Sequence, residues 1–265
     1  PGARDRSFTT QPARHNEFNI NLAYIEAKLA HERFRGRLAL QAGTSVQSNY
    51  AGEPAVGSVS GPSLLRHIQE AVVGVRVLPK LWIDGGIYFS HIGLESFISK
   101  DNWTYTRSLM SDFSPYYQAG AKVTYEMLEQ LLLQFHVING WQNVSENNDQ
   151  KAVGFQVAFT PSSRWSLTYN NFLGTESGTS WRFFNDLVAK VSVTDSFQLA
   201  AVYDIGMQTR VGLSPSIWHV GALLARYQFH PVFALALRGE RFMDPDQVIV
   251  TTGTQGEPTS ALARI

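Results

Sequence analysis

Charged side chains recur at every second position in several short segments whose other residues are apolar. In an extended strand this spacing puts the charges on one face and the apolar side chains on the other. Charges on the inner wall of a water-filled tube orient and filter hydrophilic solutes, whereas the same charges in neutral pairs only hold the wall together. Both interpretations stay open for the candidate interior residues, which are Arg35, Arg37, Glu70, Arg76, Asp84, Lys122, His136, Asp186, Lys190, Asp204, Arg238 and Glu240. Because their signs nearly balance, we expect weak ion selectivity.

The segment 91–115 is the second candidate, because it is long and rich in aromatic and charged residues. It could fold inward and narrow a channel, or it could form an ordered outer cap on its neighbours. We expect Asp101 to cap a short helix over residues 102–110. A metal site from this segment lacks recognisable ligand spacing, so no metal is expected. The candidate residues of the loop are His91, Glu95, Asp101, Trp103, Arg107 and Asp112.

Motifs of catalysis are missing from the sequence. Neither GxSxG nor HExxH occurs, and there is no cysteine to act as a nucleophile or a thiolate ligand. His136 falls on a polar face, where we expect a hydrogen-bonded interior histidine rather than a catalytic base. Trp141 in the amide-rich segment 139–151 could bind a sugar, although a hydrogen-bonded surface loop is the expectation. We therefore predict neither enzyme activity nor a cofactor.

The elements that must position these residues are strands. Twelve segments with period-2 patterning predict strands, and they are joined alternately by short turns and long polar loops. Short turns on one side and long loops on the other are typical of an outer-membrane barrel. The long loops are expected at 48–66, 91–115, 141–151, 174–181, 209–216 and from 243 onward. The strands are expected near 17–29, 34–47, 67–78, 81–90, 116–126, 130–140, 152–160, 165–173, 182–192, 197–208, 217–229 and 232–242.

The two faces of these strands indicate which side meets lipid. Segment 197–208 alternates Phe197, Leu199 and Ala201 with Gln198 and Ala200, and other segments behave alike. Small and polar residues on one face suit a wet interior, whereas a soluble barrel fills its interior with bulky apolar side chains. Aromatic residues at strand ends are expected to form interfacial girdles. These residues are Tyr117, Tyr125, Trp165, Phe197, Trp218 and Phe233.

Composition agrees with a membrane barrel and excludes other classes. The 22 acidic and 22 basic residues of the 265-residue chain give no net charge, so nucleic acid is not an expected partner. Charged residues make up only 17%, against about 25% in average soluble domains. No apolar run is long enough for a membrane helix. A soluble β-sandwich or barrel is the alternative fold.

Several stretches resemble one family of bacterial outer-membrane β-barrels, the OmpL-like β-barrel porin-2 family. They are "NEFNINLAYIE", "FRGRLALQAGTSVQSNYAGEP", "HIGLESFISKDNWTYTRSLMSDFSPYYQAG", "INGWQNVSENNDQKAVG", "NNFLGTES" and "RGERFMDPDQVIVTTG". The resemblance implies a transmembrane barrel in the bacterial outer membrane. Members of that family carry a strand before "NEFN" and further strands after "DPDQVIV", and we expect this chain to lack both.

The sequence thus predicts one all-β domain over residues 1–265, a closed antiparallel up-and-down transmembrane β-barrel. About 12 strands are expected in this chain, as part of a barrel of 14–16 strands that is incomplete at both ends; a complete 12-strand barrel is the alternative. The expected function is passive diffusion of small hydrophilic solutes. A non-conducting structural or anchoring barrel in an envelope assembly is the alternative. Expected partners are outer-membrane lipid, solutes, and further copies or envelope proteins.

Overall fold

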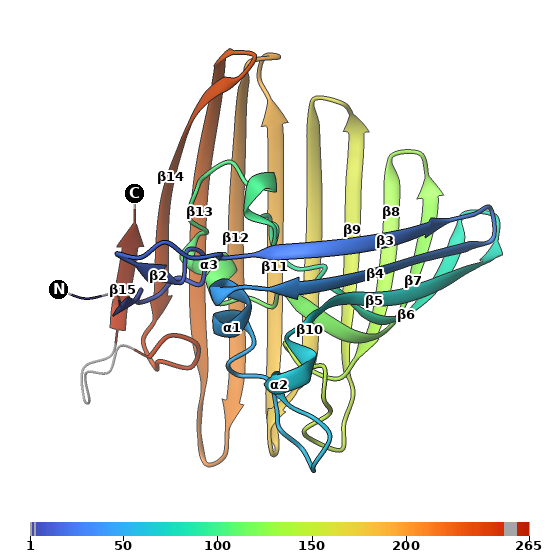
Figure 1. The fold of residues 1–265 in the computed structure, drawn as a ribbon, viewed down its shortest axis with the longest axis vertical. Coiled ribbons are helices and arrows are strands. Elements are labelled where there is room, and N and C mark those ends of the chain that lie inside the picture. Colours follow the sequence, from blue (N-terminus) through green and yellow to red (C-terminus); the bar gives the residue numbers. More distant parts are fainter. Residues whose placement is uncertain (1, 3, 252–258, 265) are drawn as a thin grey trace.

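The computed structural model describes residues 2, 4–251 and 259–264, and strands dominate them (Figure 1). The main strands are β3 (Ala23–Ala30), β4 (Phe34–Ala42), β5 (Ile68–Leu78), β6 (Leu81–Phe89), β7 (Tyr117–Leu128), β8 (Leu131–Ile138), β9 (Ala152–Ser162), β10 (Trp165–Ser177), β11 (Ser180–Ser192), β12 (Phe197–Arg210), β13 (Leu213–His230), β14 (Phe233–Asp244) and β15 (Thr259–Arg264). Each of the twelve predicted segments corresponds to one strand from β3 to β14. The alternating apolar pattern therefore located every strand that it predicted.

These strands form one antiparallel meander, in which each strand pairs with the next along the chain. The order runs from β3 to β15, thirteen strands among the described residues, and the sheet curves strongly around a central space (Figure 1). In the described part of the chain β3 and β15 each have one neighbour. The predicted up-and-down sheet is confirmed, and its closure into a barrel stays a prediction.

The expectation that no strand follows "DPDQVIV" was wrong, because β15 pairs with β14 beyond that segment. Before "NEFN", the chain forms a small antiparallel pair of its own, β1 (Arg4–Asp5) and β2 (Arg14–His15). Four short helical turns complete the described structure: α1 (Thr44–Asn49), α2 (Pro62–Leu65), η1 (Ser99–Asp101) and α3 (Leu109–Asp112). No helix among the described residues is long and apolar enough to cross a membrane.

Two of the predicted long loops, 174–181 and 209–216, are tight hairpins instead. Strands β10 and β11 continue to the two residues 178–179, and β12 and β13 continue to 211–212. Gly178 and Gly212 adopt positive φ angles of 57° and 71°, a conformation that tight turns require and that glycine adopts without strain. These stretches are polar because they are strand ends, which extend past the apolar zone of the sheet. The loops predicted at 48–66, 91–115 and 141–151 are present.

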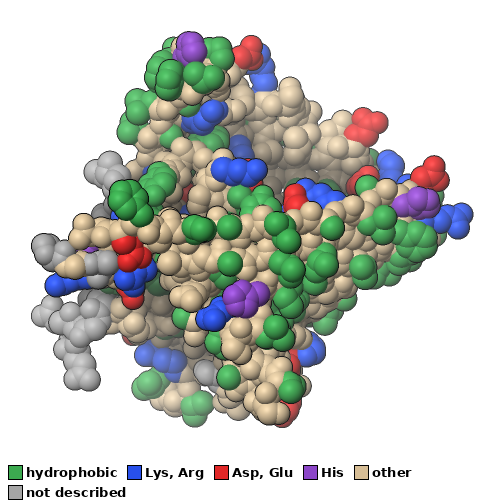
Figure 2. Space-filling view, in the orientation of Figure 1, with side chains coloured by type: hydrophobic (Ala, Val, Ile, Leu, Met, Phe, Trp, Pro, Cys, Tyr) green, Lys and Arg blue, Asp and Glu red, His purple; other side chains and the backbone are tan. Residues whose placement is uncertain are grey.

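One face of the sheet is apolar and exposed. At the centre of β11 to β14 the outward side chains include Leu187, Tyr203, Leu223 and Leu237, which are 43%, 50%, 68% and 61% exposed. Figure 2 shows hydrophobic side chains over the foreground strands β3 and β4, with charged groups gathered at the turn ends. Such a belt with charges at its margin is typical of a surface that meets lipid.

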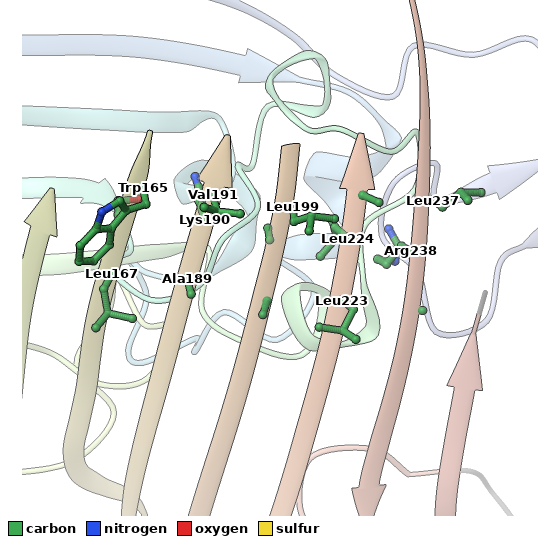
Figure 3. Close-up of a pocket in the computed structure, with 15 residues that line it drawn as sticks. Trp165, Leu167, Ala189, Lys190, Val191, Leu199, Leu223, Leu224, Leu237 and Arg238 are labelled. Carbon is green, nitrogen blue, oxygen red and sulfur yellow. The ribbon is translucent and has the colours of Figure 1, made fainter. Parts of the chain in front are cut away.

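A hollow of about 820 Å³ interrupts this apolar face over β10 to β14 (Figure 3). It arises where small residues stand between bulky ones in two neighbouring outward rows. One row runs through Leu167, Ala189, Ala201, Leu223 and Gly239, and the other through Trp165, Val191, Leu199, Ala225 and Leu237. The outward side chains therefore fill little volume here, and the surface that they form is almost entirely apolar.

The interior is more apolar than the sequence analysis expected. Inward residues of β11 to β14 form a buried core with the loop 91–115, and this core includes Val188, Val202, Val220 and Phe242. The expectation of small and polar inward residues is met only in part on β11 to β14, where such apolar residues stand beside buried charged ones. These inward side chains are apolar because another part of the chain covers them, so they never face water.

Two aromatic residues assigned to the interfacial girdles lie elsewhere. Tyr117 is buried, stacked on Tyr50 at 4.1 Å, and donates its hydroxyl hydrogen to Glu53. Trp218 is buried on the inner side of β13, where its ring fits against Gly206 of β12. The assignment rested on position near a strand end, which does not distinguish the two faces of the sheet. Tyr125, Trp165 and Phe233 are exposed as expected, and Phe197 is half-buried.

Candidate functional site

The loop 91–115 folds into the interior and packs on the inner wall of β10 to β14 (Figure 1). Its first residues are held by the wall directly. His91 places Nδ1 3.0 Å from Gln118 Oε1 and Nε2 2.9 Å from the Asn171 carbonyl oxygen. Gly93 donates its backbone N–H to Asp186 at 2.7 Å. Of the two positions that the sequence left open for this loop, the inward one is observed.

Gly154 on β9 makes room for His91. A Cβ atom at this position would lie 2.6 Å from Cε1 of the imidazole, which is closer than carbon atoms pack. The ring also stacks on His136 with centroids 4.1 Å apart. Burial lowers the pKa of His91 from its ordinary value of 6.5, and the positive charge of Lys122 acts in the same direction. His91 is therefore a neutral anchor that joins the loop to strands β7 to β10.

A second anchor is the guanidinium of Arg238 on β14. It donates to Thr104 Oγ1 at 2.6 Å and to the carbonyl oxygens of Thr106 and Arg107 at 2.5 and 2.8 Å. Glu95 lies 3.5 Å from the same group. Arg238 is buried, and five donors in a planar fork suit it to hold a turn of backbone in place.

Glu240 and Glu95 fix the helical turn at the end of the loop. Glu240 accepts a hydrogen bond from the Leu109 N–H at 2.5 Å, and Glu95 accepts one from the Ser108 N–H at 2.8 Å. Ser108 caps α3, because its side chain accepts from the Ser111 N–H. The predicted helix over 102–110 capped by Asp101 was wrong. Asp101 is the last residue of the short turn η1 and is exposed. The residue that caps the helical turn of this loop is Ser108.

The chain before β3 covers this loop from the other side. Asp112 accepts hydrogen bonds from Thr10 N and Oγ1 at 3.1 and 2.6 Å and from the Tyr116 hydroxyl at 3.1 Å. Burial raises the pKa of Asp112 above its ordinary value. Arg107, fully buried, lies 4.1 Å over the Tyr116 ring and bonds the Phe97 carbonyl oxygen. Of the remaining predicted loop residues, Trp103 packs against the main core.

Behind the loop, two carboxylates stand side by side on the wall. Asp186 and Asp204 are opposite one another in the register of β11 and β12, and both are buried. One oxygen of Asp186 accepts from Gly93 N and from Asn170 Nδ2. Asp186 thus supports the loop, and neither carboxylate is exposed.

The wall formed by β4 to β8 is not covered by the loop in this way. A cavity of about 350 Å³ lies against it, lined among others by Arg35, Arg37, Asp84 and Lys122. Arg35 binds both oxygens of Asp84, at 2.6 and 2.5 Å. Arg37 pairs with Glu70, and also with Glu26 on β3 at 2.6 Å.

Three predicted interior cations stand without a carboxylate partner among the described residues. Lys122 lies 4.5 Å over the Tyr88 ring, and Arg76 lies 5.9 Å over the Trp82 ring. Lys190 and Arg76 are exposed, and Lys122 is half-buried. The predicted interior charges thus include two distinct groups: Asp186, Arg238 and Glu240 on β11 to β14 bind the loop, whereas Arg35, Arg37, Asp84 and Lys122 on β4 to β7 line the cavity.

Sequence reasoning missed some residues of the site. Glu53 is buried and accepts hydrogen bonds from Tyr117, Val144 N and Ser145 N, so it ties together two outer loops. Two guanidinium groups lie over the Trp82 ring: that of Arg35 is 4.5 Å from the ring centroid, and that of Arg76 is 5.9 Å from it. Trp82 was on the polar face of its segment, and an aromatic residue among polar ones was the signal available.

The binding sites considered for metal and sugar find no support in the described part of the chain. No group of three or more His, Asp or Glu residues there could hold a metal ion. Trp141 packs edge-to-face on Phe172 and Phe184 and is covered by the Arg182 guanidinium at 5.1 Å. Its ring thus contacts the protein's own side chains.

Comparison with known proteins identifies the family. A family model described as "Putative beta-barrel porin-2, OmpL-like" matches residues 1–262. The chain belongs to this family. The family resemblance predicted from the sequence is thereby confirmed, and the protein is a porin-family β-strand protein of the bacterial outer membrane.

Solved structures agree at the level of the fold. The outer membrane channel DcaP of Acinetobacter baumannii is 10% identical, with a TM-score of 0.55, covering 86% of this chain and 67% of that one. Weaker similarity links the chain to the outer membrane protein OmpT of Vibrio cholerae (12% identity, TM-score 0.45, 91% of this chain and 86% of that one). A mutant of the Rh. blastica porin is 12% identical, with a TM-score of 0.41 and 84% of both chains covered. A search of the curated proteins found no match.

Proposed function

We propose that this protein is an outer-membrane channel through which small hydrophilic solutes diffuse passively, with no chemical step. In this proposal the sheet closes into a single transmembrane barrel, because an open sheet edge in lipid would leave backbone N–H and C=O groups unpaired. The observation that supports it most directly is the loop 91–115, which is anchored inside the sheet and leaves the polar wall of β4 to β8 beside it.

The loop gives the proposed channel a fixed constriction. Its hydrogen bonds reach several separate strands, among them β10 through His91, β11 through Gly93 and β14 through Arg238. A segment held at both ends cannot swing freely, so solutes would pass beside it along β4 to β8. The partners in this proposal are outer-membrane lipid around the barrel and small solutes within it.

Planar-bilayer recording of the full-length protein tests the channel. We expect discrete conductance steps, and we expect larger steps when residues 95–112 are replaced by a short Gly-Ser linker, because the constriction is then removed. A control variant that replaces only the exposed residues 149–150 of another outer loop should leave the step size unchanged. Folded protein that stays silent in both forms would contradict the proposal.

A second candidate function is a non-conducting barrel that serves as a structural or anchoring component of the envelope. The buried core between the loop and β11 to β14 favours it, because this core fills part of the interior. Under this alternative the intact protein is silent, and only the variant without residues 95–112 conducts. The same recordings therefore distinguish the two candidates.

A further inference from the structure

The interior carboxylates and the interior cations differ in exposure, although their numbers nearly balance. Each predicted interior carboxylate is at most 7% exposed: Glu70, Asp84, Asp186, Asp204 and Glu240. Of the six predicted cations only Arg238 is buried, while Arg35, Arg37, Arg76, Lys122 and Lys190 are half-buried or exposed. A solute in the interior therefore meets positive groups more readily than negative ones.

Several of these carboxylates are occupied by the protein's own donors. Asp186 receives the Gly93 N–H, Glu240 receives the Leu109 N–H, and Asp84 receives two donors from Arg35. Two of these donors belong to the loop 91–115. Docking of the loop thus covers the acidic part of the wall on β11 to β14, and it leaves the wall with Arg35, Arg37 and Lys122 next to the cavity.

Lys122 is the centre of the uncovered wall. It lies opposite Asp84 in the register of β6 and β7, yet both oxygens of Asp84 are bound by Arg35. Its ammonium group has the Tyr88 ring on one side, and no described carboxylate lies within 4.0 Å of it. Thr124 and Gln134 line the same cavity and supply further hydrogen-bonding groups.

Exposed carboxylates on this side are few and lie at its margins. Glu26 on β3 is exposed, but it pairs with Arg37 and with Lys28 at 3.0 Å. Glu126 lines the cavity from the end of β7, next to the short turn. Neither stands against Lys122 or Arg76 in an ion pair in the described structure.

We propose that the channel prefers small anionic solutes, and that Lys122 and Arg76, together with Arg35 on β4, form the path that attracts them. This inference rests on the proposed channel function and names its solute class. Charged rings and ladders in pores select ions of opposite sign, and fields in a narrow low-dielectric passage are stronger than in open water.

The test is the reversal potential of full-length protein in planar bilayers under a potassium chloride gradient. We expect a chloride-to-potassium permeability ratio above one. Lys122→Gln combined with Arg76→Gln should lower the ratio about two- to fivefold. The attraction between two unit charges a few ångströms apart in water changes an equilibrium constant by about that factor. Asp84→Asn, which releases Arg35, should shift the ratio in the opposite direction.

The control is Arg164→Gln, which removes one positive charge at the exposed turn between β9 and β10. It should leave the ratio unchanged, and each variant is first shown to be folded by its heat-dependent migration on gels. A conducting pore with a ratio of one or below, or one that the double variant leaves unchanged, overturns the anion preference alone. A silent, folded protein overturns the channel function and this inference together.

Discussion

At the scale of single residues, His91 shows how a neutral side chain in a polar interior can hold a loop. It reaches the Asn171 carbonyl oxygen on one side and Gln118 on the other, and it stacks on His136. The two acceptor oxygens favour an imidazolium ion, but burial has the larger effect, the positive charge of Lys122 adds to it, and the pKa of His91 is lowered. The anchor therefore depends on the imidazole of His91 remaining in its neutral form.

This gives a prediction for pH. Burial lowers the pKa of His91 in the folded protein, whereas the unfolded chain keeps the ordinary value of 6.5. Its contribution to stability is thus full above pH 6.5 and is lost as the pH falls from there through the lowered pKa. We expect the unfolding temperature to fall more between about pH 7.5 and about pH 5 in the native protein than in His91→Gln, which cannot titrate.

The control for this pH effect is His230→Gln, at the exposed turn between β13 and β14. Because His230 is exposed, its replacement should leave the pH profile of unfolding unchanged. Equal pH profiles for the native protein and His91→Gln would show that the loop does not depend on a neutral His91.

At the scale of elements, the docking of the loop on β14 depends on Arg238. Replacing Arg238 by Gln would break its buried ion pair with Glu95 and would leave several loop carbonyl oxygens without this donor. Breaking a buried pair in this way costs about 3–5 kcal/mol. We expect the free energy of unfolding, measured by denaturant titration in lipid vesicles, to fall by about that much.

Arg226→Gln is the matched control, on the neighbouring strand β13. Arg226 is half-buried and donates only to the side-chain oxygens of Gln198 and Gln228. Its loss should cost about 1 kcal/mol, as for an ordinary hydrogen bond. If both variants lost the same stability, the anchoring role of Arg238 would be wrong.

The elements also show what sequence can and cannot predict here. Alternation placed all twelve strands from β3 to β14, because the lipid-facing side imposes a strict period of two. It failed at 174–181 and 209–216, where strands extend beyond the lipid. Polar residues there do not indicate a loop. It could not locate the cap of α3, since Ser108 and Asp101 are both good caps and their choice depends on Glu95.

The interior charges were predictable in place but not in role. The alternating pattern placed Asp186, Asp204 and Glu240 on the inner face, as observed. Their burial comes from a loop more than 70 residues away in sequence, which local pattern does not report. Counting charges therefore predicted a balanced interior, whereas the folded loop decides which of them a solute can meet.

At the scale of the whole molecule, the exposed apolar face and the polar interior invert the arrangement of a soluble sheet. Val157 and Ala158 are neighbours at the centre of β9, facing outward and inward respectively. Arginine on the lipid face of a barrel costs about 2–4 kcal/mol at the bilayer midplane. We expect Val157→Arg to lose about that much stability in vesicles, measured by denaturant titration.

Ala158→Arg is the control, since the same side chain would then point toward the polar interior. It should cost clearly less than Val157→Arg. The reverse order would favour a soluble sheet with its apolar face covered by protein, which was the alternative fold considered for this chain.

The long reach of the loop's contacts has a consequence for the order of assembly. The bonds from Arg238 to Thr104 and from Glu240 to Leu109 join residues 134 and 131 positions apart. Contacts between such distant positions form late, because the chain entropy of closing the intervening segment must be overcome first. Strands β7 to β13 must therefore be in place before the loop can settle. An unfinished molecule is then wider inside than the finished one, and its passage narrows only when β14 arrives.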